Sequence, residues 1–216
     1  MMRIFYLIFT LHKIVKYLIS NTKRYSNILF LIMIYRPKSI MEIGVYKGQR
    51  SIEMILAAKI FNKDISYYGF DLFKNINENI KNKELSKFPY TKRKIQQRLK
   101  KYAKVKLFEG YTKDTLDKIH NKKIDLIFID GGHSIQTINN DWEKSKKFHK
   151  KNTIIIFDDY YVNDKKIIKN FGCNKIIKKI SSYNYKKKFC FFTDRFNNQN
   201  NKLNIKMIFL KKLENE

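Results

Sequence analysis

Two short apolar runs in the middle of the chain end in carboxylates, and these acids are the residues best suited to chemistry. The first run ends in Asp130, and the second ends in the pair Asp158 and Asp159. A run of β-branched and aromatic residues between polar residues is typical of a strand buried on both faces of a parallel sheet. Because the carboxyl ends of such strands meet at the edge where open α/β sheets bind ligands, we expect the three acids to converge on one site.

A structural reading of these acids remains open beside the functional one. A carboxylate after a strand often caps the next helix, and for Asp130 that interpretation is as good as a site. A consecutive pair of acids fits capping less well, since one cap needs one acceptor. Gly131 and Gly132 indicate a turn that something approaches closely. His133 could act as a general base, because its ordinary pKa is near neutrality, or equally as a structural histidine that holds the loop.

Apolar and helical periodicities alternate along most of the chain. They predict strands at residues 39–43, 65–71, 105–109, 124–130 and 153–158, and helices at residues 49–61, 91–102, 113–120, 134–148 and 164–171. Residues 188–193 and 204–210 flank an Asn-rich tip at 197–201 and predict a hairpin. Residues 74–90 are polar and irregular, as in a mobile lid or insertion. This order predicts an α/β fold, with a doubly wound, Rossmann-like, mostly parallel sheet and a C-terminal antiparallel β-hairpin.

The composition limits the setting and the partners of the protein. The chain has 46 Lys and Arg against 19 Asp and Glu, a formal net charge of +27. Such a surface attracts polyanions such as nucleic acid, acidic glycan or anionic lipid, although an AT-rich coding bias could supply many of the lysines. Cys173 and Cys190 lack the spacing of a zinc site or a disulfide framework. We therefore expect a cytoplasmic protein.

Residues 1–35 predict an N-terminal amphipathic helical extension to a domain at 36–216. Neither apolar run of the extension reaches the roughly 20 residues of a membrane-spanning helix, and no signal peptide is evident. Residues 1–20 could form an interfacial helix on the inner face of an anionic membrane. They could instead cover the sheet or form a homodimer contact. Hydrophobic periodicity is the same in all these cases and cannot separate them, and we favour this second interpretation.

The first strand–helix turn points to a family. Glu42-Ile43-Gly44-Val45-Tyr46-Lys47-Gly48 resembles the E/D-x-G-x-x-x-G loop of class I S-adenosylmethionine-dependent methyltransferases. The resemblance covers about residues 36–212 and implies S-adenosylmethionine as the cofactor. The implied cofactor-binding residues are Glu42, Gly44, Gly48, Asp71, Thr112 and Asp130. In that arrangement the glycines let the backbone lie against the ligand, the helix N-terminus faces its carboxylate, and Asp71 accepts both ribose hydroxyls.

The loops after the fourth and fifth strands narrow the resemblance. Asp130-Gly131-Gly132-His133 with Asp158-Asp159-Tyr160 is similar to metal-dependent O-methyltransferases of the macrocin and catechol type. This similarity implies a divalent ion, with Mg²⁺ expected, held by Asp130, Asp158 and Asp159, and catalytic roles for Asp130 and His133. The ion would lower the pKa of an acceptor hydroxyl. Lys151-Asn152 departs from the Pro-Gly-Gly of many such enzymes, and relatives with His-Asp in place of Asp-Asp need no metal.

The expected function is O-methylation of a hydroxylated small molecule or sugar, which could be part of an anionic glycan. An RNA methyltransferase is an alternative because residues 92–104 are strongly basic. Against nucleic acid as the partner, no Asp/Asn-Pro-Pro-Tyr loop follows the fourth strand and neither cysteine lies in a Pro-Cys loop. A further alternative is a non-catalytic, membrane-peripheral protein with the same fold, which the complete acidic set disfavours.

Overall fold

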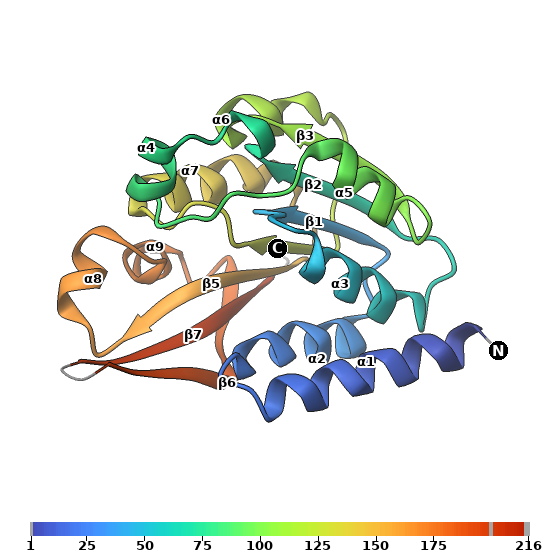
Figure 1. The fold of residues 1–216 in the computed structure, drawn as a ribbon, viewed down its shortest axis with the longest axis horizontal. Coiled ribbons are helices and arrows are strands. Elements are labelled where there is room, and N and C mark those ends of the chain that lie inside the picture. Colours follow the sequence, from blue (N-terminus) through green and yellow to red (C-terminus); the bar gives the residue numbers. More distant parts are fainter. Residues whose placement is uncertain (1, 199–200, 214–216) are drawn as a thin grey trace.

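A seven-stranded sheet organises the computed structural model, which describes residues 2–198 and 201–213 (Figure 1). Its strands are β1 (Ser39–Ile43), β2 (Ser66–Asp71), β3 (Lys104–Glu109), β4 (Leu126–Ile129), β5 (Ile154–Val162), β6 (Tyr185–Asn198) and β7 (Asn201–Lys212). The order is β3-β2-β1-β4-β5-β7-β6, with β1 to β5 parallel and β7 and β6 antiparallel. The predicted Rossmann-like sheet and C-terminal hairpin are confirmed, while positions 199–200 of the predicted tip lie outside the described residues.

Helices cover both faces of this sheet, mostly where the sequence predicts them. They are α3 (Gln49–Lys59), α4 (Glu78–Lys83), α5 (Lys92–Leu99), α6 (Thr112–Thr115), α7 (Ile135–Ser145), α8 (Lys165–Asn170) and α9 (Asn174–Lys179). Ser134 caps α7, because its hydroxyl accepts the N–H of Thr137. Two short helices, α4 and α9, were not predicted, and α4 lies in the segment expected to be irregular.

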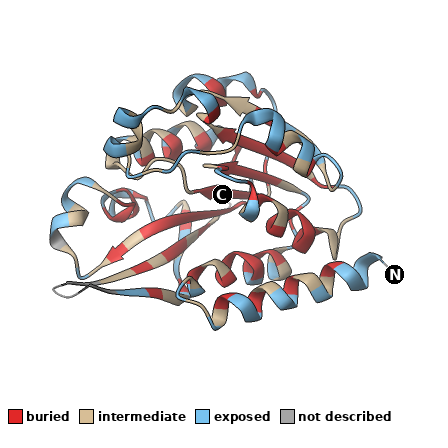
Figure 2. Cartoon of the chain, viewed as in Figure 1, coloured by how far each residue is buried: buried red, intermediate tan, exposed pale blue. Residues whose placement is uncertain are grey.

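The N-terminal extension packs onto the domain. Its helices α1 (Met2–Leu18) and α2 (Ser26–Tyr35) lie against α3, which covers one face of the sheet (Figure 2). Ile14, Ile28 and Ile32 are buried in the same hydrophobic cluster as Ile40 of β1 and Phe128 of β4. The extension and the sheet therefore share one core. No helix among residues 2–198 and 201–213 has the length and apolar character needed to cross a bilayer.

A bulge in β5 decides where the acid pair points. The pairing of β5 with β7 shifts register between Phe157 and Tyr160, and Asp159 has a φ of 55°. The strand expected to end at Asp158 therefore continues to Val162, with both acids inside it. A bulge disrupts the alternation of side chains along a strand, so neighbouring residues can reach different partners.

A buried carboxyl group joins α3 to the middle of the sheet. Glu42 of β1 is 1 % exposed, and its Oε2 accepts hydrogen bonds from Ser51 Oγ at 2.5 Å and from the Tyr67 hydroxyl. Burial raises the pKa of Glu42 to about 8, although both hydrogen bonds lower it. The side chain is therefore mostly protonated at neutral pH.

We predict that Glu42→Gln removes a pH-dependent loss of stability. The folded pKa of Glu42, about 8, lies above its ordinary value of 4.5, so the folded chain binds more protons and loses stability as pH rises through this interval. Glutamine keeps an uncharged oxygen acceptor for Ser51 and Tyr67. Thermal unfolding at about pH 5 and about pH 8.5 should show a smaller difference in the variant than in the wild type. Equal differences would contradict a neutral buried Glu42.

Candidate active site

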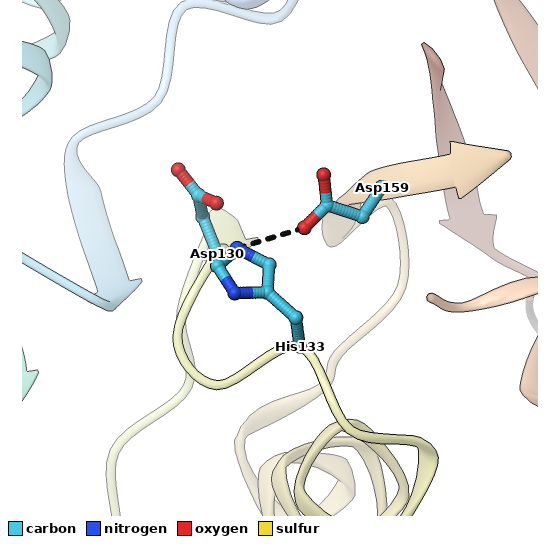
Figure 3. Close-up of side chains that lie close together, drawn as sticks. All are labelled: Asp130, His133 and Asp159. Carbon is cyan, nitrogen blue, oxygen red and sulfur yellow. Dashed lines mark ion pairs between the residues drawn. The ribbon is translucent and has the colours of Figure 1, made fainter. Parts of the chain in front are cut away.

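Three of the predicted site residues come together at the carboxyl ends of β4 and β5. Asp130 follows β4, His133 lies on the loop before α7, and Asp159 lies in the β5 bulge. One potential ligand atom from each lies within 4.8 Å of the others, and Figure 3 shows the three side chains converging. The sequence prediction that acids from these two strand ends meet holds for Asp130 and Asp159.

His133 lies between two hydrogen-bond acceptors. Its Nε2 is 3.0 Å from Asp159 Oδ2, and its Nδ1 is 2.6 Å from the carbonyl oxygen of Glu84. A carbonyl oxygen and an ionised carboxylate only accept, so this geometry favours the imidazolium, in which both nitrogens donate. Burial lowers the pKa of His133, but the hydrogen bond and charge of Asp159 and the charge of Asp130 raise it to about 10. His133 can act as a base only after losing that proton.

The carboxylate of Asp130 differs from the other two groups of the cluster in its hydrogen bonding. Among the described residues, none donates a hydrogen bond to it. Burial raises the pKa of Asp130, and the neighbouring charges of Asp158 and Asp159 raise it further. An unpaired carboxylate with a raised pKa is suited to accept a proton or to bind a cation.

Glu84 holds the loop that carries His133, and sequence reasoning did not find it. Its carboxylate accepts hydrogen bonds from the Ser134 hydroxyl and the Thr137 hydroxyl through Oε1, at 3.0 and 2.9 Å. Its Oε2 accepts the backbone N–H of Ser134 at 3.0 Å. The segment predicted to be a lid, residues 74–90, therefore holds the His133 loop through Glu84 in its interior. No spacing in the sequence relates Glu84 to a loop some 50 residues later.

Asp158 belongs to a different cluster from Asp159. Both of its oxygens accept from the guanidinium of Arg24, with Nε to Oδ1 at 2.7 Å and Nη2 to Oδ2 at 2.9 Å. Arg24 Nη1 donates to Asp194 of β6, and the Arg24 backbone N–H donates to Asp194 Oδ1 at 2.8 Å. All three residues are buried. The predicted ligand set of Asp130, Asp158 and Asp159 is thus divided, because Arg24 already neutralises Asp158.

The predicted cofactor loop is tightly tied to its surroundings. Asp71 Oδ2 accepts the N–H groups of Val45 and Tyr46 at 2.9 and 2.8 Å, and Oδ1 accepts that of Phe73 at 3.1 Å. A carboxylate has about four acceptor positions, so roughly one remains for a ribose hydroxyl where two were expected.

Gly44 and Gly48 of this loop are glycine for different structural reasons. A Cβ on Gly44 would lie 1.9 Å from the carbonyl oxygen of Asp130, so the backbone that follows β4, as well as any ligand, requires glycine there. Gly48 precedes α3 with a φ of 72° and offers no side-chain cap, which leaves N–H groups at the start of α3 for an anion.

Two further predicted cofactor residues are engaged inside the protein. Glu42 is buried with Ser51 and Tyr67, as described above, so its effect on a ligand would be through the position of α3. The Thr112 hydroxyl donates to Asp141 Oδ1 at 2.5 Å and accepts from Asn140 at 3.1 Å. Burial raises the pKa of Asp141 to about 7, although hydrogen bonds from Thr112 and Asn140 to its carboxylate lower it. Sequence reasoning did not identify Asp141, because in the sequence it is an ordinary acidic residue within a predicted helix.

Comparisons with known proteins agree with this fold. Residues 41–160, more than half of the chain, match the family model described as a methyltransferase domain. An O-methyltransferase from Bacillus cereus, solved in complex with SAH, has a TM-score of 0.55 and 15 % identity over 98 % of this chain and 90 % of that chain. The O-methyltransferase TomG from Streptomyces achromogenes, involved in tomaymycin synthesis and solved with SAM, has a TM-score of 0.55 and 11 % identity over 87 % and 78 %.

Other chemistry occurs on the same fold. An rRNA methylase from Streptococcus thermophilus has a TM-score of 0.56 and 13 % identity, and the match covers 87 % of this chain and 95 % of that chain. A comparison with curated protein sequences found no match. The fold is that of class I S-adenosylmethionine-dependent methyltransferases. The chain belongs to the methyltransferase-domain family.

Removing the charge of Arg24 should destabilise the protein strongly. We expect Arg24→Met to cost about 3–5 kcal/mol in unfolding free energy, because it leaves two buried carboxylates, Asp158 and Asp194, without their cation. Arg93→Met, on the exposed surface of α5, is the matched control and should change stability by less than about 0.5 kcal/mol. Urea unfolding of both variants measures the difference. Similar small effects would show that the ion pairs are not required.

Proposed function

We propose that the protein transfers the methyl group of S-adenosylmethionine to a hydroxyl oxygen of a small molecule or sugar. The observation that supports this most directly is the unpaired Asp130 carboxylate beside the cofactor loop. The space where a Gly44 Cβ would point is filled by the Asp130 carbonyl, so a cofactor on this loop lies next to Asp130. An acceptor hydroxyl between the two would then face both a methyl donor and a proton acceptor.

The cofactor contacts follow from the free groups of the loop. The uncapped N-terminus of α3 suits the carboxylate of S-adenosylmethionine, because its N–H groups and the helix dipole favour an anion. The remaining acceptor position of Asp71 suits one ribose hydroxyl. Glu42 and Thr112 would support the cofactor site indirectly, through α3 and α7.

The cluster of Asp130, His133 and Asp159 has the composition of a divalent-cation site. Two carboxylates and one imidazole suit Mn²⁺ and similar ions, whereas Mg²⁺ prefers oxygen ligands alone. We therefore propose Mn²⁺ ahead of the Mg²⁺ expected from the sequence, with His133 in the place of Asp158. When bound, such an ion would act as a Lewis acid that lowers the pKa of the acceptor hydroxyl.

The protein groups have separate tasks in the proposed reaction. Asp130 takes the proton from the acceptor hydroxyl as the oxygen attacks the methyl group. Before an ion binds, Asp159 and His133 hold each other in place through their 3.0 Å contact, and Glu84 holds the other ring nitrogen. The positive charge of Arg24 balances Asp158 and keeps a third negative charge away from the reacting oxygen.

A cationic groove next to the site favours an acceptor that carries negative charge. The groove has a volume of about 520 Å³ and is bordered by Ser134, which directly follows His133. Four lysines line it: Lys83, Lys169, Lys175 and Lys179. Lysines grouped in a concave surface raise the local concentration of anions. An acidic sugar or a phosphorylated small molecule would satisfy both the groove and the proposed chemistry.

We expect Asp130→Asn to reduce methyl transfer by at least about 100-fold, because asparagine cannot accept the hydroxyl proton. Asp117→Asn, at an exposed acid paired with Lys144 and Lys147, is the matched control and should keep full activity. Transfer from radiolabelled S-adenosylmethionine to catechol, glucuronic acid and glucose 6-phosphate measures the reaction. Calorimetry with S-adenosylmethionine should show a loss of affinity below about tenfold for Asp130→Asn. Unchanged transfer by this variant would contradict the role of Asp130.

Binding of Mn²⁺ should strengthen as pH rises. The ion must displace the proton of His133, whose pKa is raised to about 10, so affinity should increase by up to about tenfold per pH unit between about pH 6 and 9. His133→Gln should weaken binding and remove most of this dependence, while His120→Gln, at an exposed histidine, should not. Calorimetry with Mn²⁺ provides the measurement. Equal pH dependence in both variants would exclude His133 as a ligand.

A further inference from the structure

The outer surface of α1 carries an apolar stripe that no described part of the chain covers. Ile4, Ile8, Leu11, Val15 and Ile19 recur at helical spacing and are 46–82 % exposed. The opposite side of the helix, with Tyr6, Thr10, Ile14 and Tyr17, is buried against the domain. An amphipathic helix normally faces solvent with its polar side, so an apolar outer stripe indicates a partner.

The stripe ends at a small concave surface with cationic and aromatic walls. This hollow has a volume of about 370 Å³ and lies between the chain after α1 and strand β6. Lys23 and Arg195 line it together with Phe191, which is 87 % exposed. Ile19, the last residue of the stripe, directly precedes Ser20, which also lines the hollow. Apolar, aromatic and basic groups therefore continue from α1 to β6.

The charge around this surface is of one sign. Residues 1–41 contain seven Lys and Arg and no Asp or Glu, within a chain of net charge +27. Lys13 pairs with Glu53, and Arg24 is buried with Asp158, while Lys16 and Lys23 have no described ion-pair partner and are exposed. The surface therefore favours a partner with negative charge.

We propose that α1 and the hollow beside it dock on an anionic lipid bilayer, with α1 lying in the plane of the interface. The apolar stripe would enter the headgroup region, and Lys23 and Arg195 would contact lipid phosphate. A second copy of the chain fits less well, because a helix pair across the stripe would bring the basic flanks of both chains together with no acid in residues 1–41 to offset them.

Docking would also place the candidate active site near the membrane. Arg24 follows Lys23 directly, and its side chain points inward to Asp158. One turn of the chain therefore joins the docking surface to the ion-pair cluster beside the site, so an acceptor at the bilayer surface would be close to the site.

Sedimentation with vesicles of equal parts phosphatidylglycerol and phosphatidylcholine at low salt tests this proposal. The full chain should bind these vesicles and should bind pure phosphatidylcholine at least about tenfold more weakly. Ile8→Gln with Val15→Gln leaves the charge unchanged and should reduce binding at least about tenfold, because two apolar anchors are lost. Tyr183→Gln with Phe88→Gln, at exposed aromatic residues outside the surface, is the matched control and should bind normally.

A second pair of variants separates the hollow from general surface charge. Lys23→Gln with Arg195→Gln should weaken binding more than Lys169→Gln with Lys175→Gln, which removes the same charge from the groove beside α7. Circular dichroism should confirm that every variant folds. Equal loss in the two charge pairs, unchanged binding after the α1 substitutions, or equal binding to both vesicles would each overturn the proposal. A dimer in solution that the α1 substitutions dissociate, without vesicle binding, would assign the stripe to a second copy instead.

Discussion

One guanidinium group connects the N-terminal helices to the edge of the sheet where chemistry is proposed. Arg24 contacts Asp158 of β5 and Asp194 of β6, and all three side chains are buried. Charges removed from water are tolerated only when they are paired and hydrogen-bonded, so these three positions depend on one another. The same pairing leaves Asp159 for His133 and Asp130. An acidic edge is thereby divided into a structural ion-pair cluster and a cluster that is available for chemistry.

The fold was predictable from the sequence because its strongest signals are local. Apolar runs such as Ile154–Phe157 are typical of buried strands, and a serine such as Ser134 before an amphipathic run is a favoured helix start. Trp142 and Phe148 follow Ile138 at helical spacing, and all three are buried in the same cluster. The short helix α9 was missed because six residues carry too little periodicity to be recognised.

The site was predictable only in part, because its decisive contacts are distant in sequence. Strand ends brought Asp130 and Asp159 together as expected, since parallel strands share an edge. A bulge is invisible in the residue pattern, so the two consecutive acids were expected to act together, whereas in the structure Asp158 accepts hydrogen bonds from Arg24 and Asp159 contacts His133. Arg24 and Glu84 lie in segments whose sequence does not indicate a position near the sheet edge, and only the three-dimensional structure places them there.

The contact between Arg24 and Asp194 spans 170 residues, and this separation bears on how the protein is made. At the ribosome the N-terminal helices emerge first, and their acidic partner follows only after about 10–30 s of further synthesis. For that interval Arg24 has no Asp194 to pair with. Because β7 lies between β5 and β6, the sheet can be completed only after β7 has also left the ribosome, so the final folding step of this chain is late and long-range.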